Sequence, residues 1–201
     1  VNLRVPSGTL MVLEGPNGSG KTTFLELIAG TVEPDSGKVL LGGRQAEGLA
    51  PIDRGVFYIP QTLHKFWSLQ HDSRLCFIPR RTVRENLLAA AGDYGEAMEW
   101  LCRLDLEDYA DETPERLSFG LQQRLALARA AMLRPGVILV DEGLSALDPG
   151  MRSEVFDLLR RIPERTGNTV VYVTHHTEDA DRLGGVLYRF RDGKLFCGRD
   201  V

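Results

Sequence analysis

The chain has 201 residues, a length that fits one α/β domain or one domain with a small inserted subdomain. Hydrophobic residues make up 43% and charged residues 26% of the sequence, and the net charge is −4. The apolar fraction is enough for a sizeable core, whereas the negative charge gives no general attraction to nucleic acid or anionic lipid. We therefore expect a globular protein that does not bind nucleic acid directly.

Three widely spaced cysteines form no CxxC pair and have no histidine set near them. Such an odd, sparse count is typical of a reducing compartment and predicts no metal site built from these thiols. No stretch of the sequence approaches the roughly 20 apolar residues that cross a bilayer, and no secretory signal opens the chain. We expect the chain to be soluble by itself and to reach a membrane only through a partner.

The first predicted elements alternate between strand and helix. Thr9–Leu13 is a short apolar run of the kind that forms a buried strand entering a glycine turn. A helical pattern follows from Lys21, and Glu33–Gly37 has the composition of a turn. Strands are predicted at Lys38–Leu41 and at Val56–Ile59.

The middle of the chain is predicted to be helical. Thr82 and Glu85 have the spacing of a capping box, which starts a helix through Ala91. Further helices are predicted over Glu96–Leu104 and Leu117–Leu133.

The last third returns to strands. Val137–Val140 is fully apolar and rich in β-branched residues, as a central parallel strand is. Asp148 followed by Pro149 predicts an N-cap with proline at the first helical position, in a helix to about Ile162. Thr169–Val173 is predicted to be another buried strand.

The end of the sequence predicts a hairpin. Asp192-Gly193 is a turn signal between the predicted strands Tyr188–Arg191 and Lys194–Cys197. Strands alternating with helices, a helical block and a final hairpin indicate an α/β fold with a mainly parallel central sheet. We expect residues 1–201 to form a single domain, with an inserted helical subdomain over roughly 82–134.

The segment between the first predicted strand and helix matches the phosphate-binding pattern GxxxxGK[ST] of a P-loop NTPase. Its glycines let backbone N–H groups turn toward phosphate oxygens, and the helix N-terminus adds partial positive charge. Lys21 is expected to reach the β- and γ-phosphates, and the Thr22 hydroxyl to bind Mg²⁺. The residues predicted to bind the nucleotide are Gly15, Pro16, Asn17, Gly18, Ser19, Gly20, Lys21, Thr22 and Thr23.

Two adjacent carboxylates follow the apolar strand that begins at Val137. Asp141 is predicted to lie at the C-terminal end of that strand, where open α/β sheets bind ligands, and to help hold Mg²⁺. Glu142 is predicted to polarise the attacking water. The alternative is that Glu142 is only a solvated charge at a strand end.

With these residues the sequence resembles the ATP-binding-cassette (ABC) ATPases over essentially the whole chain. Leu117–Leu121 resembles the signature LSGGQ of that family, and residues 145–148 resemble its D-loop. Gln61 and His175, each shortly after a predicted strand, resemble the Q-loop glutamine and the switch histidine. The motifs stand in the order that the family requires.

The resemblance implies that ATP is bound between two cassettes, with the P-loop of one facing the signature of the other. Ser118, Gly120 and Asp148 would serve the site of the second chain, in a homodimer or a heterodimer. His175 would contact the γ-phosphate, and Gln61 the metal or the attacking water. Taken singly, Ser118 would be only an N-cap and His175 only a polar residue at a strand end.

Three residues depart from the family pattern. Phe119 replaces the first glycine of the signature, Leu121 its glutamine, and Gly143 the proline after the catalytic glutamate. Leu121 lacks the side-chain amide that would complete a capping pair with Ser118. This predicts a weaker contribution of the signature motif to the site that it shares with the second chain. Only 14 residues precede Gly15, so we expect the strand carrying an adenine-stacking aromatic residue to be missing or trimmed.

The stretch between Gln61 and Thr82 is longer than the family usually has. Its aromatic residues and arginines suit an interface with helices of a transmembrane partner, and the alternative is a loop folded onto its own domain. The residues concerned are His64, Lys65, Phe66, Trp67, Arg74, Phe77, Arg80 and Arg81.

The resemblance leaves more than one function open. The first is an ATPase subunit on the cytoplasmic face of a membrane that powers transport through a separate transmembrane permease. The second is a soluble cassette ATPase acting on nucleic acid, ribosomes or protein complexes. The sequence has neither a long coiled-coil insertion nor room for a second cassette, which disfavours the second function. Glu142 and His175 together disfavour a module that binds nucleotide without turnover.

Overall fold

The computed structural model describes residues 1–61, 76–142, 144, 147–191 and 193–198. Within these residues one sheet has the strand order β4-β5-β6-β1-β7-β8. All neighbouring strands are parallel except β8, which runs antiparallel to β7. The predicted mainly parallel sheet and terminal hairpin are confirmed. The strands are β1 (Leu10–Glu14), β4 (Val56–Ile59), β5 (Val137–Asp141), β6 (Thr169–Thr174), β7 (Val186–Arg191) and β8 (Lys194–Cys197).

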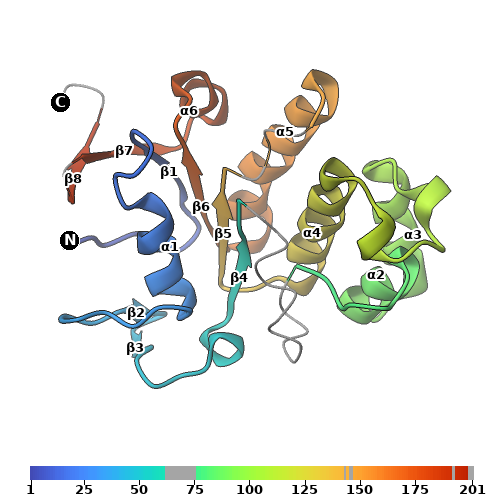
Figure 1. Cartoon of the computed structure of the whole chain (residues 1–201), viewed down its shortest axis with the longest axis horizontal. Coiled ribbons are helices and arrows are strands. Elements are labelled where there is room, and N and C mark those ends of the chain that lie inside the picture. The colour runs from blue at the N-terminus through green and yellow to red at the C-terminus, as the bar shows by residue number, and fades with distance from the viewer. Residues whose placement is uncertain (62–75, 143, 145–146, 192, 199–201) are drawn as a thin grey trace.

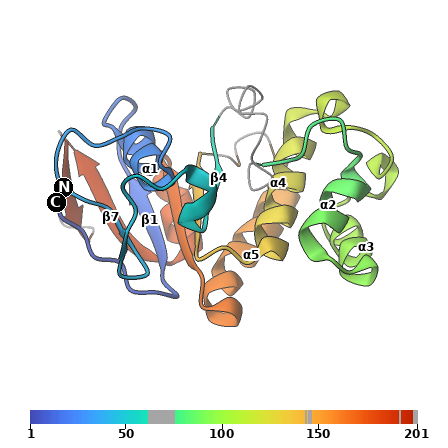
Figure 2. The same cartoon turned by 90° about the horizontal axis from the view of Figure 1, so that it is seen from below.

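The helices are divided between the sheet and a separate group (Figure 1). α1, α5 and α6 lie along the sheet, whereas α2 packs against α3 and α4 beyond β4. Seen from below, α1 and the group of α2 to α4 lie on opposite sides of β4 (Figure 2). The bounds are α1 (Lys21–Ala29), α2 (Val83–Ala91), α3 (Tyr94–Arg103), α4 (Phe119–Leu133), α5 (Pro149–Thr166) and α6 (Thr177–Leu183).

The two faces of the sheet belong to two apolar clusters. Met11 and Leu13 pack in a smaller cluster with Leu25 of α1. Val12, between them in β1, belongs to the larger cluster on the opposite face, which includes residues of α2 to α6. This alternation follows from the two-residue period of a strand.

Local capping signals are confirmed where helices begin. The Thr82 hydroxyl accepts a hydrogen bond from the Glu85 amide at 3.2 Å, and the Glu85 carboxylate accepts one from the Thr82 amide at 2.8 Å. Asp148 caps α5 by accepting from the Met151 amide at 3.0 Å, with Pro149 at the first helical position. Each cap satisfies a backbone donor that a helix start leaves open.

Several predicted bounds are wrong by a few residues. α5 does not end near Ile162 but continues through Pro163 to Thr166, where Gly167 takes a left-handed conformation and closes the helix. α3 begins earlier than predicted because Asp93 caps it by accepting from the Glu96 amide.

The strand expected at Lys38–Leu41 is shorter than predicted and lies outside the main sheet. Only Leu40–Leu41 (β2) is extended, and it pairs antiparallel with Arg44–Gln45 (β3). The chain turns between the two through Gly42 and Gly43, both at positive φ.

The long stretch after Gln61 is described only in its last part, since residues 62–75, among them His64, Lys65, Phe66, Trp67 and Arg74, lie outside the described residues. Phe77 is buried in the larger cluster, so for this residue the loop-on-domain alternative holds. Arg80 and Arg81 are exposed, and the Arg80 amide donates to Glu115 at 3.0 Å.

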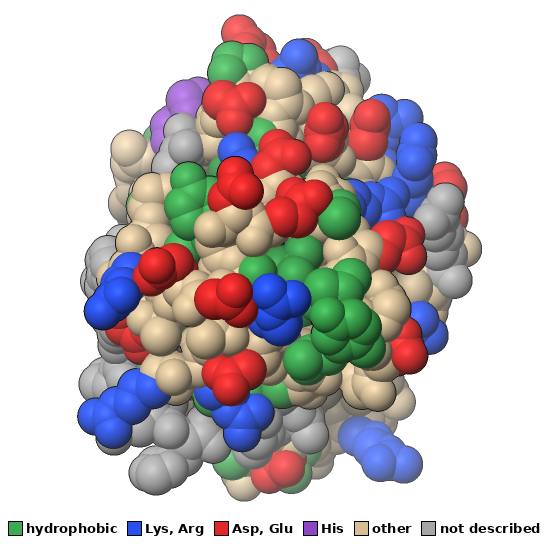
Figure 3. All heavy atoms as spheres, turned by 90° about the vertical axis from the view of Figure 1, so that its right-hand side faces the viewer, with side chains coloured by type: hydrophobic (Ala, Val, Ile, Leu, Met, Phe, Trp, Pro, Cys, Tyr) green, Lys and Arg blue, Asp and Glu red, His purple; other side chains and the backbone are tan. Residues whose placement is uncertain are grey.

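The end of the molecule that α2 and α3 form carries hydrophobic and charged side chains (Figure 3). A hydrophobic area lies among acidic and basic side chains on this face. Tyr94 of α3 and Tyr109 are among the exposed large hydrophobic residues. None of the helices in the described ranges combines the length and the apolar character that crossing a bilayer requires.

Candidate nucleotide-binding site

The predicted phosphate-binding loop joins the end of β1 to the start of α1. Gly20 is the N-cap of α1 at φ 100°, in the left-handed region, and no side chain caps this helix start. A Cβ on Gly15 would lie 2.5 Å from the Phe190 carbonyl oxygen, so only glycine fits there. The amide groups at the N-terminus of α1 are therefore available to an anion, as the motif predicts.

The Lys21 side chain folds back onto the phosphate-binding loop. Its ammonium group donates to the carbonyl oxygens of Gly15 at 2.8 Å and Pro16 at 2.9 Å. The side chain is buried, and its nitrogen also lies 3.9 Å from a Glu142 oxygen. The positive charge is thus held at the mouth of the loop.

One polar atom of the loop has no partner. The Ser19 hydroxyl is buried and makes no hydrogen bond to any described group. Leaving a buried hydroxyl unpaired is unfavourable. A phosphate oxygen beside this loop would accept a hydrogen bond from the hydroxyl, so the loop fits a phosphate group.

Asp141 at the end of β5 lies beside Thr22 at the start of α1. Asp141 ends β5 and is 1% exposed, and the Tyr58 hydroxyl donates to it at 3.3 Å. Burial raises the pKa of Asp141 above its ordinary value, while a hydrogen bond with Thr22 opposes the shift. A cation would favour the ionised form of this carboxylate. A buried carboxylate beside a hydroxyl and a phosphate cradle fits Mg²⁺, which binds through few protein ligands and the phosphates of its substrate.

The Glu142 carboxylate lies close to the other predicted catalytic residues. Its Oε2 accepts from the Gln61 amide nitrogen at 3.0 Å, and its Oε1 lies 2.9 Å from His175 Nδ1. The same Oε1 is the oxygen near Lys21. Glu142 has φ 51°, a conformation that is rare for a residue other than glycine and that is held by its amide donating to Val173. The structure therefore brings Gln61, His175, Lys21 and Glu142 together.

His175 lies in the short connection between β6 and α6. Its ring stacks on that of His176, with centroids 3.9 Å apart. The sequence pattern predicts neither α6 nor the contact between the two histidines. The nearest available signal was His176 itself, since two consecutive histidines at the end of a buried strand are uncommon.

The predicted signature residues lie in another part of the molecule. Ser118 caps α4 by accepting from the Leu121 amide at a long 3.4 Å, and Gly120 follows in the first turn. α4 and α1 lie on different sides of β4 and β5 (Figures 1 and 2). Phe119 is partly buried and packs against the larger apolar cluster. These residues do not join the site around Glu142 within one chain.

Asp148 lies on the same side as the signature. One of its oxygens accepts from Met151, and the other lies 3.1 Å from the Arg124 guanidinium of α4. The Met151 amide, with help from Arg124, lowers the pKa of Asp148 below its ordinary value. Of the predicted D-loop, residues 145 and 146 lie outside the described residues, as does Gly143.

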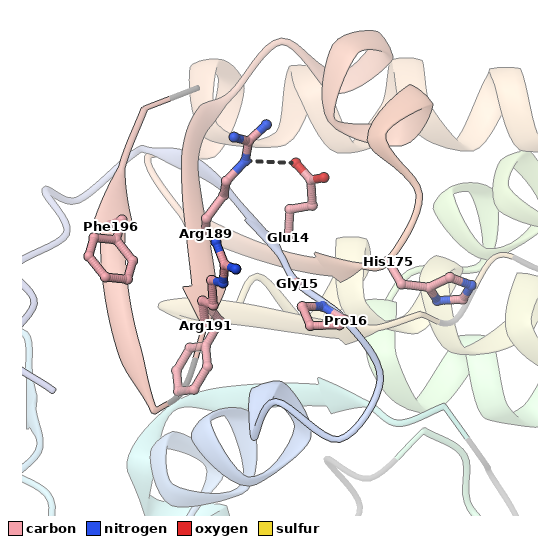
Figure 4. Close-up of a pocket in the computed structure, with 8 residues that line it drawn as sticks. Glu14, Gly15, Pro16, His175, Arg189, Arg191 and Phe196 are labelled. Atoms are coloured by element: carbon pink, nitrogen blue, oxygen red, sulfur yellow. Dashed lines mark ion pairs between the residues drawn. The ribbon is translucent and has the colours of Figure 1, made fainter. Parts of the chain in front are cut away.

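A small cavity of about 220 Å³ adjoins the start of the loop (Figure 4). Glu14 and Arg189 line it as an ion pair at 3.6 Å, and His175 and Pro16 border it. Glu14 also accepts from the Thr177 hydroxyl at 2.9 Å, which ties the start of α6 to the end of β1. Sequence patterns gave no sign of this contact because it joins residues 163 positions apart.

Comparisons with known proteins agree with this geometry. A family model described as ABC transporter matches residues 1–145. A putative 2-aminoethylphosphonate import ATP-binding protein of Salmonella paratyphi A is 35% identical over 207 residues, covering 98% of this chain and 53% of its own length. A thiamine import ATP-binding protein of Chelativorans is 36% identical, covering 96% of this chain and 77% of its own length.

The fold is also shared with a solved structure. The ATP-binding cassette MJ0796, described as a dimer bound to ADP and Pi, has a TM-score of 0.79 and 29% identity, and covers 100% of this chain and 90% of its own. The chain spans about half the length of the first curated relative named above. The loop, the paired carboxylates and these matches together identify the chain as a member of the ABC transporter family.

Proposed function

We propose that this chain binds ATP with Mg²⁺ and hydrolyses it at a site shared between two cassettes, and that closure of the pair drives transport through a separate transmembrane permease. The observation that carries the proposal is the meeting of Gln61, His175 and Lys21 at the Glu142 carboxylate. These residues come from four segments of the chain. Their convergence on one carboxylate suits activation of a water molecule beside a phosphate.

Phosphate binding follows from the loop. The amides at the start of α1 and the Ser19 hydroxyl donate to phosphate oxygens, and Lys21 exchanges the Gly15 and Pro16 carbonyls for the β- and γ-phosphates. Thr22 and Asp141 would hold Mg²⁺, and Gln61 would contact the ion or the attacking water. The ion, when bound, neutralises phosphate charge and orients the γ-phosphate.

Hydrolysis requires a base and groups that orient the water. Glu142 accepts the proton of the attacking water, because its carboxylate is held in place by Gln61 at Oε2 and by His175 at Oε1. His175 turns its ring toward the γ-phosphate from the same position. Lys21 stabilises the charge that develops on the phosphate oxygens.

The second half of the site comes from another cassette. Ser118 caps α4 and Asp148 caps α5, and both helices pack in the larger apolar cluster, on the face of the sheet opposite α1. In a head-to-tail pair these helix starts, with Gly120, therefore meet the loop of the partner. The amides behind Ser118 at the start of α4 suit the γ-phosphate. The capping hydrogen bond at Ser118 is long, and leucine stands at position 121 in place of the family's glutamine. Both features support a weaker contact between the signature motif and the partner's nucleotide.

The names of the relatives support a proposal for the partner and for the direction of transport. Both curated relatives named above are import ATP-binding proteins, so we propose import, with the chain at the cytoplasmic face of the membrane beside its permease. Their names give different substrates, and we propose none for this chain.

The proposal is tested by three proteins assayed side by side. Wild type should release phosphate from ATP in the presence of Mg²⁺. Glu142→Gln should lower turnover by about 10²–10⁴-fold while ATP binding survives, because the base is lost and the shape is kept. Lys21→Ala should instead weaken ATP binding. If Glu142→Gln hydrolysed ATP at the wild-type rate, Glu142 would not be the base.

A further inference from the structure

Asp179 of α6 is a buried carboxylate outside the site described above. It is 3% exposed, and one of its oxygens lies 2.6 Å from the Arg152 guanidinium. Its other oxygen accepts from the Tyr172 hydroxyl at 3.2 Å and from the Thr174 hydroxyl at 2.9 Å. Burying a charge is unfavourable unless it is paired and hydrogen-bonded, and Asp179 meets both conditions.

Thr174 connects this carboxylate to the switch histidine. Thr174 is the last residue of β6, and its hydroxyl donates to Asp179 while accepting from the His176 amide at 3.0 Å. His175 lies between these two residues. The backbone on both sides of His175 is therefore fixed by one hydroxyl group, whose own orientation is set by Asp179.

Arg152 connects the same carboxylate to the first turn of α5. Its amide donates to the Asp148 carbonyl at 2.9 Å, one turn above the predicted D-loop. Its guanidinium lies 5.6 Å from the centre of the Phe156 ring, which packs edge-on against Tyr172 at 5.8 Å. Asp179 thus joins the start of α5, where Asp148 is predicted to serve the site of the second chain, to the β6–α6 connection, which carries His175 of the chain's own site.

We propose that Asp179 is a positioning residue for His175. Through Thr174 it holds the His175 ring at Glu142, and through Arg152 it makes that position depend on the first turn of α5. Asp179 has no contact with Glu142 in the described structure, so it acts through His175 and not on the reacting atoms. The functional consequence rests on the proposed ATPase activity.

Two variants distinguish an effect on the position of His175 from a general loss of protein stability. Thr174→Val removes the hydroxyl that reaches the histidine connection, whereas Tyr172→Phe removes a hydroxyl from the same carboxylate oxygen but leaves that connection intact. Thr174→Val should lower kcat by about 10- to 100-fold with KM nearly unchanged, as expected for a displaced catalytic group. Tyr172→Phe should keep kcat within about twofold of wild type. Asp179→Asn should resemble Thr174→Val, and Glu178→Gln, an exposed change on the same helix, should resemble wild type.

A second background shows whether the effect passes through His175. In a His175→Ala protein, adding Thr174→Val should cost no further activity, because the residue that it positions is already gone. An undiminished additional loss would overturn the proposal.

The position of the ring is also measured without turnover. The imidazole signals of His175 in NMR spectra, assigned by comparison with His175→Ala, should shift in Thr174→Val and stay in place in Tyr172→Phe. Equal shifts in both variants, or none in either, would overturn the proposal even in a chain that hydrolyses no ATP. Absence of wild-type hydrolysis would by contrast count against the proposed function alone.

Discussion

The side-chain amide of Gln61 donates a hydrogen bond to Glu142 at 3.0 Å, although the two residues are 81 positions apart in the sequence. β4 and β5 are neighbouring parallel strands, so their C-terminal ends meet at one edge of the sheet. Gln61 follows β4 closely and Glu142 follows β5 directly. The strand order therefore places Gln61 beside Glu142. Gln61 orients the Glu142 carboxylate, which is expected to take the proton of the attacking water.

Gln61→Ala should lower kcat for ATP hydrolysis by roughly tenfold or more, because a hydrogen bond to a charged group contributes about 1.5–3 kcal/mol. The affinity for ATP should change little, since the phosphate loop is untouched. Gln61→Glu should cost more than Gln61→Ala, because it sets a second carboxylate against Glu142. Steady-state kinetics would measure both effects. Full activity in Gln61→Ala would show that the bond to Glu142 has no part in turnover.

A shared site predicts that activity depends on concentration. Phosphate release per chain should rise as the protein concentration rises, and Glu142→Gln with ATP should accumulate a dimer on size-exclusion chromatography. Lys21→Ala with ATP serves as the control and should stay monomeric, because it lacks the bound nucleotide that joins the two chains. A monomer with constant turnover per chain at every concentration would contradict the shared site.

Much of the fold could be predicted from the sequence because its signals are local. β4 matches its predicted bounds, and α2 begins at the capping box of Thr82 and Glu85. The edge of the sheet that carries the site could also be predicted, since β5 ends in Asp141, His175 follows β6 directly, and neighbouring parallel strands bring their C-terminal ends together. Local patterns were sufficient wherever one residue type determines one backbone conformation.

The remainder depends on contacts between distant segments. α6 has seven residues, too few for a helical period to stand out, and it is stabilised by contacts such as that of Asp179 with Arg152. α5 continues past Pro163 because its buried face packs on the sheet, a tertiary effect that overrides the preference of proline to end a helix. The position of Lys21 against its own loop is likewise a matter of side-chain packing, which no spacing in the sequence specifies.

Asp148 predicts a dependence of stability on pH. Its pKa is lowered from the ordinary 3.8, chiefly by the Met151 amide, so the folded state binds its proton more weakly than the unfolded chain does. The stabilisation is therefore fully present above pH 3.8 and is lost as the pH falls through the lower folded value. Asp148→Asn keeps an N-cap but removes the charge.

We expect Asp148→Asn to be less stable than wild type at pH 7, with a difference that narrows as the pH is lowered toward and below 3.8. Urea unfolding of the two proteins across this range would measure it. Asp157→Asn, an exposed change on the same helix, serves as the control for a lost surface charge. A gap that stayed constant with pH would show that the charge of Asp148 contributes nothing to stability.

A substitution at Gly30, which ends α1, is expected to lower the stability of the protein. Gly30 has φ 84°, and its amide donates to Glu26. A Cβ added at Gly30 would collide with the Arg54 guanidinium, which lies over the end of the helix. Arg54 is buried there because it donates to the carbonyl oxygens of Leu27 at 2.9 Å and Ile28 at 3.3 Å.

Gly30→Ala should therefore lower the free energy of unfolding through two separate effects. The left-handed conformation costs about 1–2 kcal/mol for a residue with a Cβ. Displacing Arg54 removes charge-assisted hydrogen bonds worth about 1.5–3 kcal/mol. Gly167→Ala is the matched control, because Gly167 ends α5 at φ 71° and a Cβ there would meet nothing within 4 Å. Urea unfolding should show Gly30→Ala to be the more destabilising by the Arg54 contribution, and in an Arg54→Ala background the two glycine changes should cost the same. Equal losses in the wild-type background would mean that Arg54 moves aside freely and does not hold the end of α1.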